Sequence, residues 1–356
     1  MQDDSRMLRI AYVTPYDEQY HSVNIHTARR VAEWNRLGAS VEQFVIGDGG
    51  RSRRGAISNA IVDFRDRSRL TSAVENFGPS VIYVRWLSPV PGLLMKLNSI
   101  APVVLDIHAN DIRETARESK MRQTYMKMYR NAELRVPNGA TFVVNELAEA
   151  PEYDILAGRR AVFGNGSWVE RRASIPDGKP KVGIAVGAPN AWTALDRYAT
   201  LAQVLQDAAI WVAVCPPDLV HEVQSQVGGT VKVVAAASEQ EYYAELASWT
   251  VGMASLGLER KGLRTATPLK VRDYVGIGLP TILPFWDEGV SPLADPLVLQ
   301  LAGEGELPAS NIDPNLIRQF IRAAHGKNLS PATCDHISGV SIESRRLKFL
   351  NEIAYL

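Results

Sequence analysis

Cysteine is scarce in this chain, and the residue spacings of common metal sites are missing. Only Cys215 and Cys334 occur among 356 residues, which is too few for a disulfide framework or a four-cysteine zinc site. No two aspartates are separated by a single residue, and none of the six histidines is paired as His-x-x-x-His. We therefore expect no metal ion in the site and a reducing, cytoplasmic location.

Other absences narrow the class of protein. The sequence holds no Walker loop, no Gly-x-Ser-x-Gly and no Gly-x-Gly-x-x-Gly, so P-loop nucleotidases, serine hydrolases and ordinary dehydrogenases lose their main support. No apolar run approaches the roughly 20 residues of a membrane span, and no signal peptide precedes Asp17. We expect a soluble protein and leave peripheral contact with the inner face of a membrane open.

Charge of either sign is not in excess, and the composition is that of a globular protein. The 39 basic and 39 acidic residues balance to a formal net charge of zero, so we expect no nucleic-acid partner held by a whole-molecule field. Hydrophobic residues make up 46% of the chain, which is enough to build a core. Because 356 residues exceed what one core usually organises, two domains are expected.

The chain alternates short β-branched apolar runs with longer segments of helical spacing, a rhythm that predicts parallel sheets covered by helices. It predicts two Rossmann-like, doubly wound α/β domains at 1–172 and 180–340, with the linker at 171–180 and a docked final helix at 341–356. The predicted strands are 8–13, 40–45, 81–84, 103–107, 140–144, 181–186, 210–214, 231–234, 251–254 and 281–283, and the predicted helices of the first half are 26–37, 69–77 and 111–135.

The loop at 257–280 carries the strongest functional signal. Thr267 and Pro268 are typical of an N-cap and a first helical position, and Gly278 of a helix end. The free amides of Leu269 and Lys270 would then attract a diphosphate. The site expected here also includes three loop cations that could close around that group and an aspartate that could accept ribose hydroxyls, namely Arg260, Lys261, Arg264 and Asp273. Solvated surface charges would explain the same residues.

Residues 268–282 read Pro-Leu-Lys-Val-Arg-Asp-Tyr-Val-Gly-Ile-Gly-Leu-Pro-Thr-Ile and resemble the signature of family-4 retaining glycosyltransferases. The resemblance implies the GT-B architecture, with two domains facing across a cleft, and sugar transfer from a nucleoside diphosphate sugar without a further cofactor. It places Asp273 where the family has a ribose-binding Glu, Thr265 where it has a Glu near the donor sugar, and Gly187 in the glycine turn of the second domain.

The acceptor side is predicted in the first half, at the carboxyl ends of its strands. The resemblance makes His108 the candidate catalytic or donor-sugar contact, while a helix-capping histidine is the alternative. Arg85 follows another strand and could bind a phosphate or an acidic acceptor, or pair with Asp106. Further acceptor candidates in polar loops are Tyr16, His21, Asn24 and Asp111. A saccharide, a lipid-linked sugar and a small molecule all remain open as acceptors.

Two alternatives to glycosyl transfer stay open. A sugar-nucleotide epimerase of the same fold would use the same diphosphate pocket. A non-catalytic glycosyltransferase-like partner protein would bind a nucleotide without turnover, and Thr265 in place of the motif Glu favours it. Incubation with the donor alone, without an acceptor, distinguishes an epimerase from a glycosyltransferase.

Overall fold

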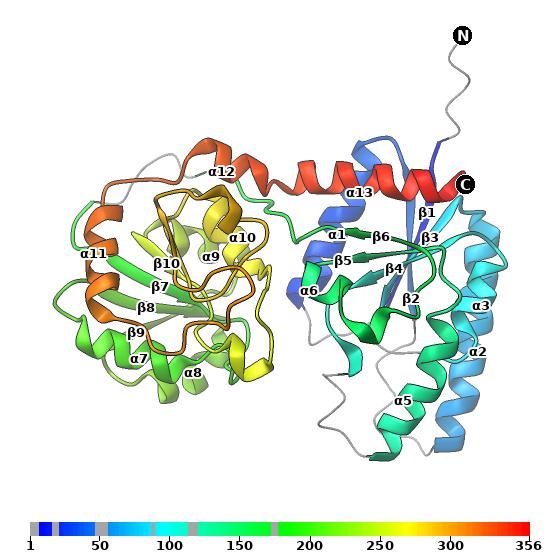
Figure 1. The fold of residues 1–356 in the computed structure, drawn as a ribbon, viewed down its shortest axis with the longest axis horizontal. Coiled ribbons are helices and arrows are strands. Elements are labelled where there is room, and N and C mark those ends of the chain that lie inside the picture. Colours follow the sequence, from blue (N-terminus) through cyan, green and yellow to red (C-terminus); the bar gives the residue numbers. More distant parts are fainter. Residues whose placement is uncertain (1–6, 16–20, 47–55, 87–89, 113–119, 172–176) are drawn as a thin grey trace, which may run out of the picture. The chain divides into compact units, whose positions relative to one another are not determined.

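Two six-stranded parallel sheets organise the chain, each in its own unit (Figure 1). The computed structural model describes residues 7–15, 21–46, 56–86, 90–112, 120–171 and 177–356. Unit 1 comprises Met1–Phe163 and Ile342–Leu356, and unit 2 comprises Gly164–Ser341. The chain therefore changes unit before the segment 171–180 in which we placed the linker.

Unit 1 is a doubly wound sheet with the strand order β2-β1-β3-β4-β5-β6. Every neighbouring pair of strands is parallel. Its elements are β1 (Arg9–Pro15), α1 (His21–Arg36), β2 (Ser40–Ile46), α2 (Ala56–Phe77), β3 (Val81–Trp86), α3 (Leu93–Asn98), β4 (Val103–Ile107), α5 (Lys120–Glu133), β5 (Gly139–Phe142), α6 (Asn145–Ala148), the 3-10 turn Pro151–Tyr153 and β6 (Arg159–Val162).

Alternate residues of these strands point to opposite faces of the sheet. On one face, Val84 and Leu105 pack with residues of α2 and α3. On the other face, Tyr83 and Val104 pack with Trp34 of α1. Because both faces are covered, the strands read as nearly continuous apolar runs, and a polar side chain inside them needs partners within the fold.

Unit 2 repeats the architecture with the strand order β12-β11-β10-β7-β8-β9. Its elements are β7 (Lys181–Ala185), α7 (Leu195–Val204), β8 (Ile210–Cys215), the 3-10 turn Pro217–Leu219, α8 (Val220–Val227), β9 (Val231–Ala235), α9 (Glu239–Ala247), β10 (Val251–Met253), the 3-10 helix η4 (Leu258–Lys261), α10 (Leu269–Gly276), β11 (Thr281–Leu283), the 3-10 turn Ser291–Leu293, β12 (Val298–Gln300), α11 (Pro314–Ala324) and α12 (Pro331–His336).

The last helix, α13 (Gly339–Ala354), begins in unit 2 and returns the chain to unit 1. Its apolar residues Phe349, Leu350 and Ile353 are buried in the same cluster as Ile10 of β1 and Trp34 of α1. Their spacing matches one face of a helix, so the C-terminal residues form part of the core of unit 1.

The doubly wound parallel sheets are confirmed, with β4 and β11 at the predicted residues. The prediction missed β6 and β12 and placed the start of α2 too late. β6 is an edge strand whose residues Arg159 and Arg160 are exposed, so it lacks the apolar run by which the other strands were predicted. Within the predicted helix at 111–135, α5 covers Lys120–Glu133 and residues 111–112 are also helical, while residues 113–119 lie outside the described residues.

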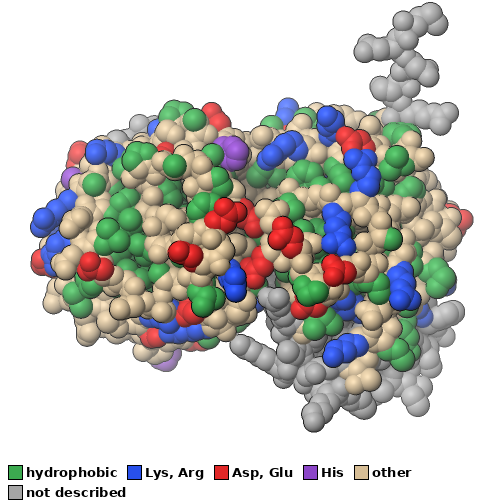
Figure 2. Space-filling view, in the orientation of Figure 1, with side chains coloured by type: hydrophobic (Ala, Val, Ile, Leu, Met, Phe, Trp, Pro, Cys, Tyr) green, Lys and Arg blue, Asp and Glu red, His purple; other side chains and the backbone are tan. Residues whose placement is uncertain are grey.

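Charged side chains of both signs are interspersed on the face of each unit that Figure 2 shows. In the described part of the chain, no helix is both long and apolar enough to cross a membrane. Among the same residues, no group of three or more His, Cys, Asp or Glu side chains could hold a metal ion.

Candidate functional site

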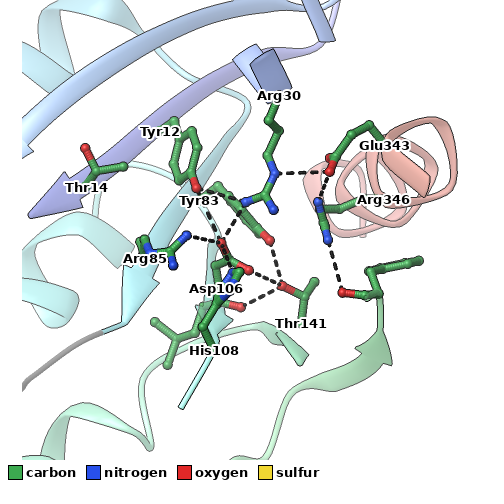
Figure 3. Close-up of polar contacts among 12 residues, drawn as sticks. Tyr12, Thr14, Arg30, Tyr83, Arg85, Asp106, His108, Thr141, Glu343 and Arg346 are labelled. Atoms are coloured by element: carbon green, nitrogen blue, oxygen red, sulfur yellow. Dashed lines mark hydrogen bonds and ion pairs between the residues drawn. The ribbon is translucent and has the colours of Figure 1, made fainter. Parts of the chain in front are cut away.

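In unit 1, a buried carboxylate gathers side chains from several elements (Figure 3). Asp106 lies on β4 and is 1% exposed. Its Oδ2 accepts hydrogen bonds from Nη1 of Arg30 at 2.8 Å and from the hydroxyl of Tyr12 at 3.3 Å. Its Oδ1 accepts from Oγ1 of Thr141 at 3.3 Å. The parallel register sets Arg85, Asp106 and Thr141 opposite one another on three adjacent strands, so these side chains share one face of the sheet.

A second buried carboxylate comes from the C-terminal helix. Glu343 of α13 accepts a hydrogen bond from Nε of Arg30 at 3.2 Å and another from Arg346. Arg346 also donates to the carbonyl of Phe163 at 3.2 Å. Although burial opposes ionisation, His108 and Arg30 hold the pKa of Asp106 well below its usual range. Asp106 is therefore ionised and paired with Arg30.

His108 lies just beyond the end of β4, with its side chain 14% exposed. Its Nε2 is 2.9 Å from Oδ2 of Asp106. Burial and the guanidinium of Arg85 lower the pKa of His108 to about 4, against the opposing influence of Asp106. The imidazole is therefore neutral near pH 7. Nε2 is buried and, although it lies beside this carboxylate, it makes no hydrogen bond within the described residues.

His26 of α1 lies in the electrostatic environment of the same residues, and it was not among the residues selected from the sequence. Burial, followed by the positive charges of Arg29, Arg30 and Arg85, lowers the pKa of His26 to about 4. His108 also contributes to this shift. Two neutral histidines therefore lie near Arg85, at the carboxyl ends of the strands, where doubly wound sheets bind ligands.

Of the acceptor candidates in unit 1 other than Arg85, only the side chain of Asp111 is described by the structure. Asp111 is 3% exposed, and its two oxygens are held by Nε of Arg130 at 2.7 Å and by the hydroxyl of Tyr153 at 2.9 Å. This pairing gives Asp111 a role inside the fold, so we leave it out of the proposed site. Tyr16 lies outside the described residues. His21 and Asn24 lie at the start of α1, but their side chains are outside the description.

In unit 2, the predicted helix start is present one residue later than expected. α10 begins at Leu269, and Pro268 occupies the N-cap position in an extended conformation. The first amides of the helix with a carbonyl acceptor are those of Val271 and Arg272, both to Pro268. Within the described chain, the amides of Leu269 and Lys270 have no acceptor. Gly278, which follows the C-cap residue Ile277, has φ 82°, and this agrees with the predicted stop.

Lys270, which carries one of these free amides, also has a positively charged side chain. Its side chain is partly buried, and burial lowers its pKa to about 8. No acidic side chain contributes to that shift, and no hydrogen bond or ion pair of Lys270 is found among the described residues. A desolvated ammonium without a counter-charge, placed beside a helix N-terminus, is suited to bind an anion.

Asp273, one turn further along α10, is 7% exposed. Its Oδ2 accepts a hydrogen bond from the hydroxyl of Tyr242 at 3.1 Å, and its Oδ1 accepts one from Tyr243 at 3.3 Å. Both tyrosines come from α9. Sequence reasoning missed them, because the separation along the chain from Asp273 is 31 and 30 residues. A ribose bound here would donate hydrogen bonds to a carboxylate that already accepts them from the hydroxyls of Tyr242 and Tyr243.

The predicted loop cations are mostly engaged within the fold. Arg260 in η4 forms two hydrogen bonds with Asp196, at 2.7 and 3.0 Å, and a third with the carbonyl of Ala191. The ammonium of Lys261 lies 5.0 Å from the ring centroid of Trp192. These contacts hold η4 against the loop after β7 and the start of α7. The role of Arg260 and Lys261 in diphosphate binding stays a prediction, and a diphosphate would compete with these internal contacts.

The remaining predicted donor-site residues are Arg264, Thr265 and Gly187, and Glu259 lies in the same loop as the first two. Arg264 is exposed and donates to the carbonyl of Gly305 at 3.2 Å. Thr265 is 8% exposed and pairs in a bridge with Trp286. Glu259, which could have replaced the missing motif Glu, forms an ion pair with Arg197 at 2.7 Å. Gly187 is exposed, with open space where a side chain would start.

Two doubly wound units of six parallel strands define the GT-B fold. No known sequence family and no curated protein matches the chain. The fold is similar to that of a glycosyltransferase from Rickettsia africae, with a TM-score of 0.64, 11% identity and coverage of 98% of this chain and 99% of that one.

Two further solved structures share the fold. One is Anabaena HepE in complex with UDP and glucose, with a TM-score of 0.61, 13% identity and coverage of 97% and 100% of the two chains. The other is AviGT4, a glycosyltransferase of avilamycin A biosynthesis, with a TM-score of 0.57, 14% identity and 98% coverage of each chain. At such identities the likeness shows the GT-B architecture of this chain.

Proposed function

We propose that this chain transfers a glycosyl group from a nucleoside diphosphate sugar to a hydroxyl acceptor, with unit 2 binding the donor and unit 1 the acceptor. The observation that carries the proposal is the start of α10. Its first two residues, Leu269 and Lys270, have amides without an acceptor among the described residues, and Lys270 also carries a desolvated ammonium. This is the chemistry that a departing diphosphate requires.

The diphosphate gains negative charge as the bond to the sugar breaks. Fixed donors stabilise that charge most effectively in a site from which water is excluded. Lys270 is partly buried, and no anion among the described residues neutralises it. Its charge is therefore available to the leaving group. Asp273 would accept the ribose hydroxyls, with Tyr242 and Tyr243 keeping the carboxylate in place.

In unit 1, His108 would contact a sugar hydroxyl through Nδ1. The neutral imidazole accepts a hydrogen bond there, while Asp106 stays beside Nε2. Asp106 acts as a positioning residue, and Arg30 anchors it at 2.8 Å. This arrangement resembles the carboxylate–histidine pairs that orient an imidazole toward a substrate.

Retention of the anomeric configuration and independence from metal are finer parts of the proposal, and both rest on the resemblance of residues 268–282 to family-4 enzymes. The anomeric proton coupling of the product, measured by NMR, tests retention. Turnover that persists in excess EDTA tests metal independence, and loss of turnover that Mg²⁺ or Mn²⁺ restores would refute it.

The first experiment is a thermal-shift panel of nucleoside diphosphates and their sugars, because a ligand that binds the native state raises its apparent stability with concentration. Lys270→Gln should reduce the shift strongly. Lys232→Gln, which removes an exposed lysine of β9, serves as the matched control. The proposal fails if no diphosphate stabilises the protein, or if both variants respond as wild type does.

A non-catalytic nucleotide-binding protein is the second candidate, because Thr265 replaces the motif Glu and is buried. A non-catalytic protein would show the same thermal shifts with nucleotides but would form no glycosylated product. Mass spectrometry of reactions with a panel of saccharide and lipid-linked acceptors decides between them. Conversion of the donor sugar to its epimer, without any acceptor, would instead identify an epimerase.

A further inference from the structure

Arg85 is the least satisfied cation of the buried cluster in unit 1. Its side chain is 12% exposed, so the guanidinium has lost most of its hydration. The nearest carboxylate is that of Asp106, with 3.9 Å between Nη1 and Oδ2. That distance is beyond a hydrogen bond. Figure 3 shows Arg85 approaching the carboxylate from β3, on a different side from Arg30.

The carboxylate oxygen nearest Arg85, Oδ2 of Asp106, already accepts hydrogen bonds from other residues. Oδ2 of Asp106 accepts from Arg30 and Tyr12, and Nε2 of His108 lies 2.9 Å from it. Within the described residues, Arg85 has no hydrogen bond to any acceptor. Its fork of donors is thus available to a group from outside the chain.

The charges of the cluster do not balance. It contains three guanidinium groups, those of Arg30, Arg85 and Arg346, and two carboxylates, those of Asp106 and Glu343. Glu343 is paired with Arg30 and Arg346, which leaves the excess positive charge at Arg85. Arg85 keeps only the long ion pair with Asp106, whose Oδ2 it shares with Arg30. A buried charge that is incompletely compensated is costly, so an anion at this position would be stabilised.

The two histidines of the site cannot supply that anion. Arg85 lies close enough to His26 and His108 to lower the pKa of both, and both are neutral near pH 7. Arg29 adds a further positive charge beside His26. Neutral imidazoles next to a guanidinium offer hydrogen bonds to a bound group without competing for the cation.

We propose that Arg85, beside Asp106 and His108 and in the neighbourhood of His26, forms a subsite of unit 1 for an oxyanion group, a phosphate or a carboxylate carried by the acceptor. A planar guanidinium binds either group through two parallel hydrogen bonds. The assignment to the acceptor rests on the proposed function, whereas the oxyanion subsite itself does not. It would make this enzyme selective for phosphorylated or acidic acceptors over neutral sugars.

The subsite can be tested by NMR of the whole protein labelled with ¹³C at histidine Cε1. Six histidines give six signals, and His26→Gln and His108→Gln assign the two of interest. Methyl phosphate and sodium acetate are titrated separately at constant ionic strength and about pH 7. We expect the His26 and His108 signals to move saturably with at least one probe, and the stronger probe identifies the oxyanion.

Arg85→Gln should weaken the binding of that probe by about ten- to one-hundredfold, the range expected for lost hydrogen bonds between charged groups. Arg85→Lys keeps the charge and should bind with intermediate affinity. Arg159→Gln, at a half-exposed arginine of unit 1 paired with Glu352, is the matched control and should bind as wild type does. Far-UV circular dichroism checks that each variant is folded.

Lys270→Gln separates this subsite from the donor site. It should leave the histidine response unchanged while it weakens nucleoside diphosphate binding. The proposal is overturned if neither probe moves the two signals in wild type, or if folded Arg85→Gln responds as wild type does. If the histidine signals respond to a probe but no nucleoside diphosphate binds, the subsite is supported and the proposed function is refuted. If a nucleoside diphosphate binds but the histidine signals do not respond, the proposed function stands and the subsite is refuted.

Discussion

Oδ2 of Asp106 lies 2.9 Å from Nε2 of His108, and the same oxygen accepts a hydrogen bond from Arg30 at 2.8 Å. One carboxylate oxygen therefore connects an imidazole at the edge of the sheet to a guanidinium inside the fold. Arg30 is in turn bonded to Glu343 of the C-terminal helix. The orientation of His108 thus depends on residues from three separate parts of the chain.

Removing the imidazole should affect turnover more than nucleotide affinity, because His108 lies in unit 1 and the proposed diphosphate site lies in unit 2. We expect His108→Ala to lower kcat by about one hundredfold, the lower end of the range for a positioned acid or base, and to leave the Kd of the nucleoside diphosphate unchanged. Steady-state kinetics and calorimetry measure the two quantities. The control is His325→Ala, at an exposed histidine of unit 2, and wild-type kcat in His108→Ala would remove the histidine from the site.

Acid should destabilise unit 1 through its two buried histidines. The folded pKa of His26 and of His108 is about 4, whereas an unfolded histidine titrates near 6.5. The unfolded chain therefore binds more protons between these values, so stability is complete above about pH 6.5 and is lost as the pH falls toward 4. For His108 the loss is at most about 3 kcal/mol.

Urea unfolding at pH 7 and pH 4.5 measures this loss. His108→Gln cannot take up the proton, so its stability should fall less between the two pH values than that of wild type. An equal fall in both proteins would show that His108 does not titrate with unfolding.

Diphosphate binding should weaken at alkaline pH, because Lys270 has a pKa of about 8 in the free protein. Above this value, binding must be accompanied by protonation of Lys270. The affinity should therefore be constant from pH 6.5 to 7.5 and fall toward about tenfold per pH unit above 8. Calorimetry in buffers of different ionisation enthalpy detects the proton uptake. Lys270→Gln should bind weakly with a flatter pH profile, and a profile as steep as that of wild type would assign the titration to another group.

Asp273→Asn should weaken ribonucleotides selectively. The change keeps the shape of the side chain and removes its charge, and hydrogen bonds to charged groups contribute about 1.5–3 kcal/mol, so the affinity should fall by about one to two orders of magnitude. A 2′,3′-dideoxy analogue should bind wild type weakly and be nearly insensitive to the change. Tyr242→Phe retains the carboxylate and removes one internal competitor. Equal weakening of the ribo and dideoxy ligands would exclude the ribose contact.

Unit 2 should depend on a buried ion pair that has no place in the proposed chemistry. Arg272 and Asp287 are 0% exposed, and Nη2 lies 2.5 Å from Oδ1. Arg272→Met leaves the carboxylate buried without its partner, at a cost of about 3–5 kcal/mol. Arg318→Met, which breaks a surface pair with Asp207, should cost less than about 1 kcal/mol. Urea unfolding compares the two, and equal losses would contradict the assignment.

Much of the fold was predictable because the strands of a doubly wound sheet are covered on both faces and read as apolar runs. Strands β4 and β11 have the predicted bounds for this reason. The edge strands β6 and β12 lack such runs and were missed. Local chemistry also predicted the end of α10, since Gly278 adopts the left-handed conformation that glycine accommodates.

The sequence by itself determined the two parallel sheets and the position of the helix that begins beside Lys270, because periodicity, turn residues and helix ends are local properties of the chain. The tertiary structure alone decided which charges meet. Arg30 is 76 residues from Asp106 and 313 from Glu343, and no local pattern encodes pairings at such separations. Folding paired Arg260 with Asp196 and left Lys270 and Arg85 without a hydrogen-bonding anion among the described residues. Burial and charge balance, which exist only in the folded chain, make these two cations the candidates that we propose for ligand binding.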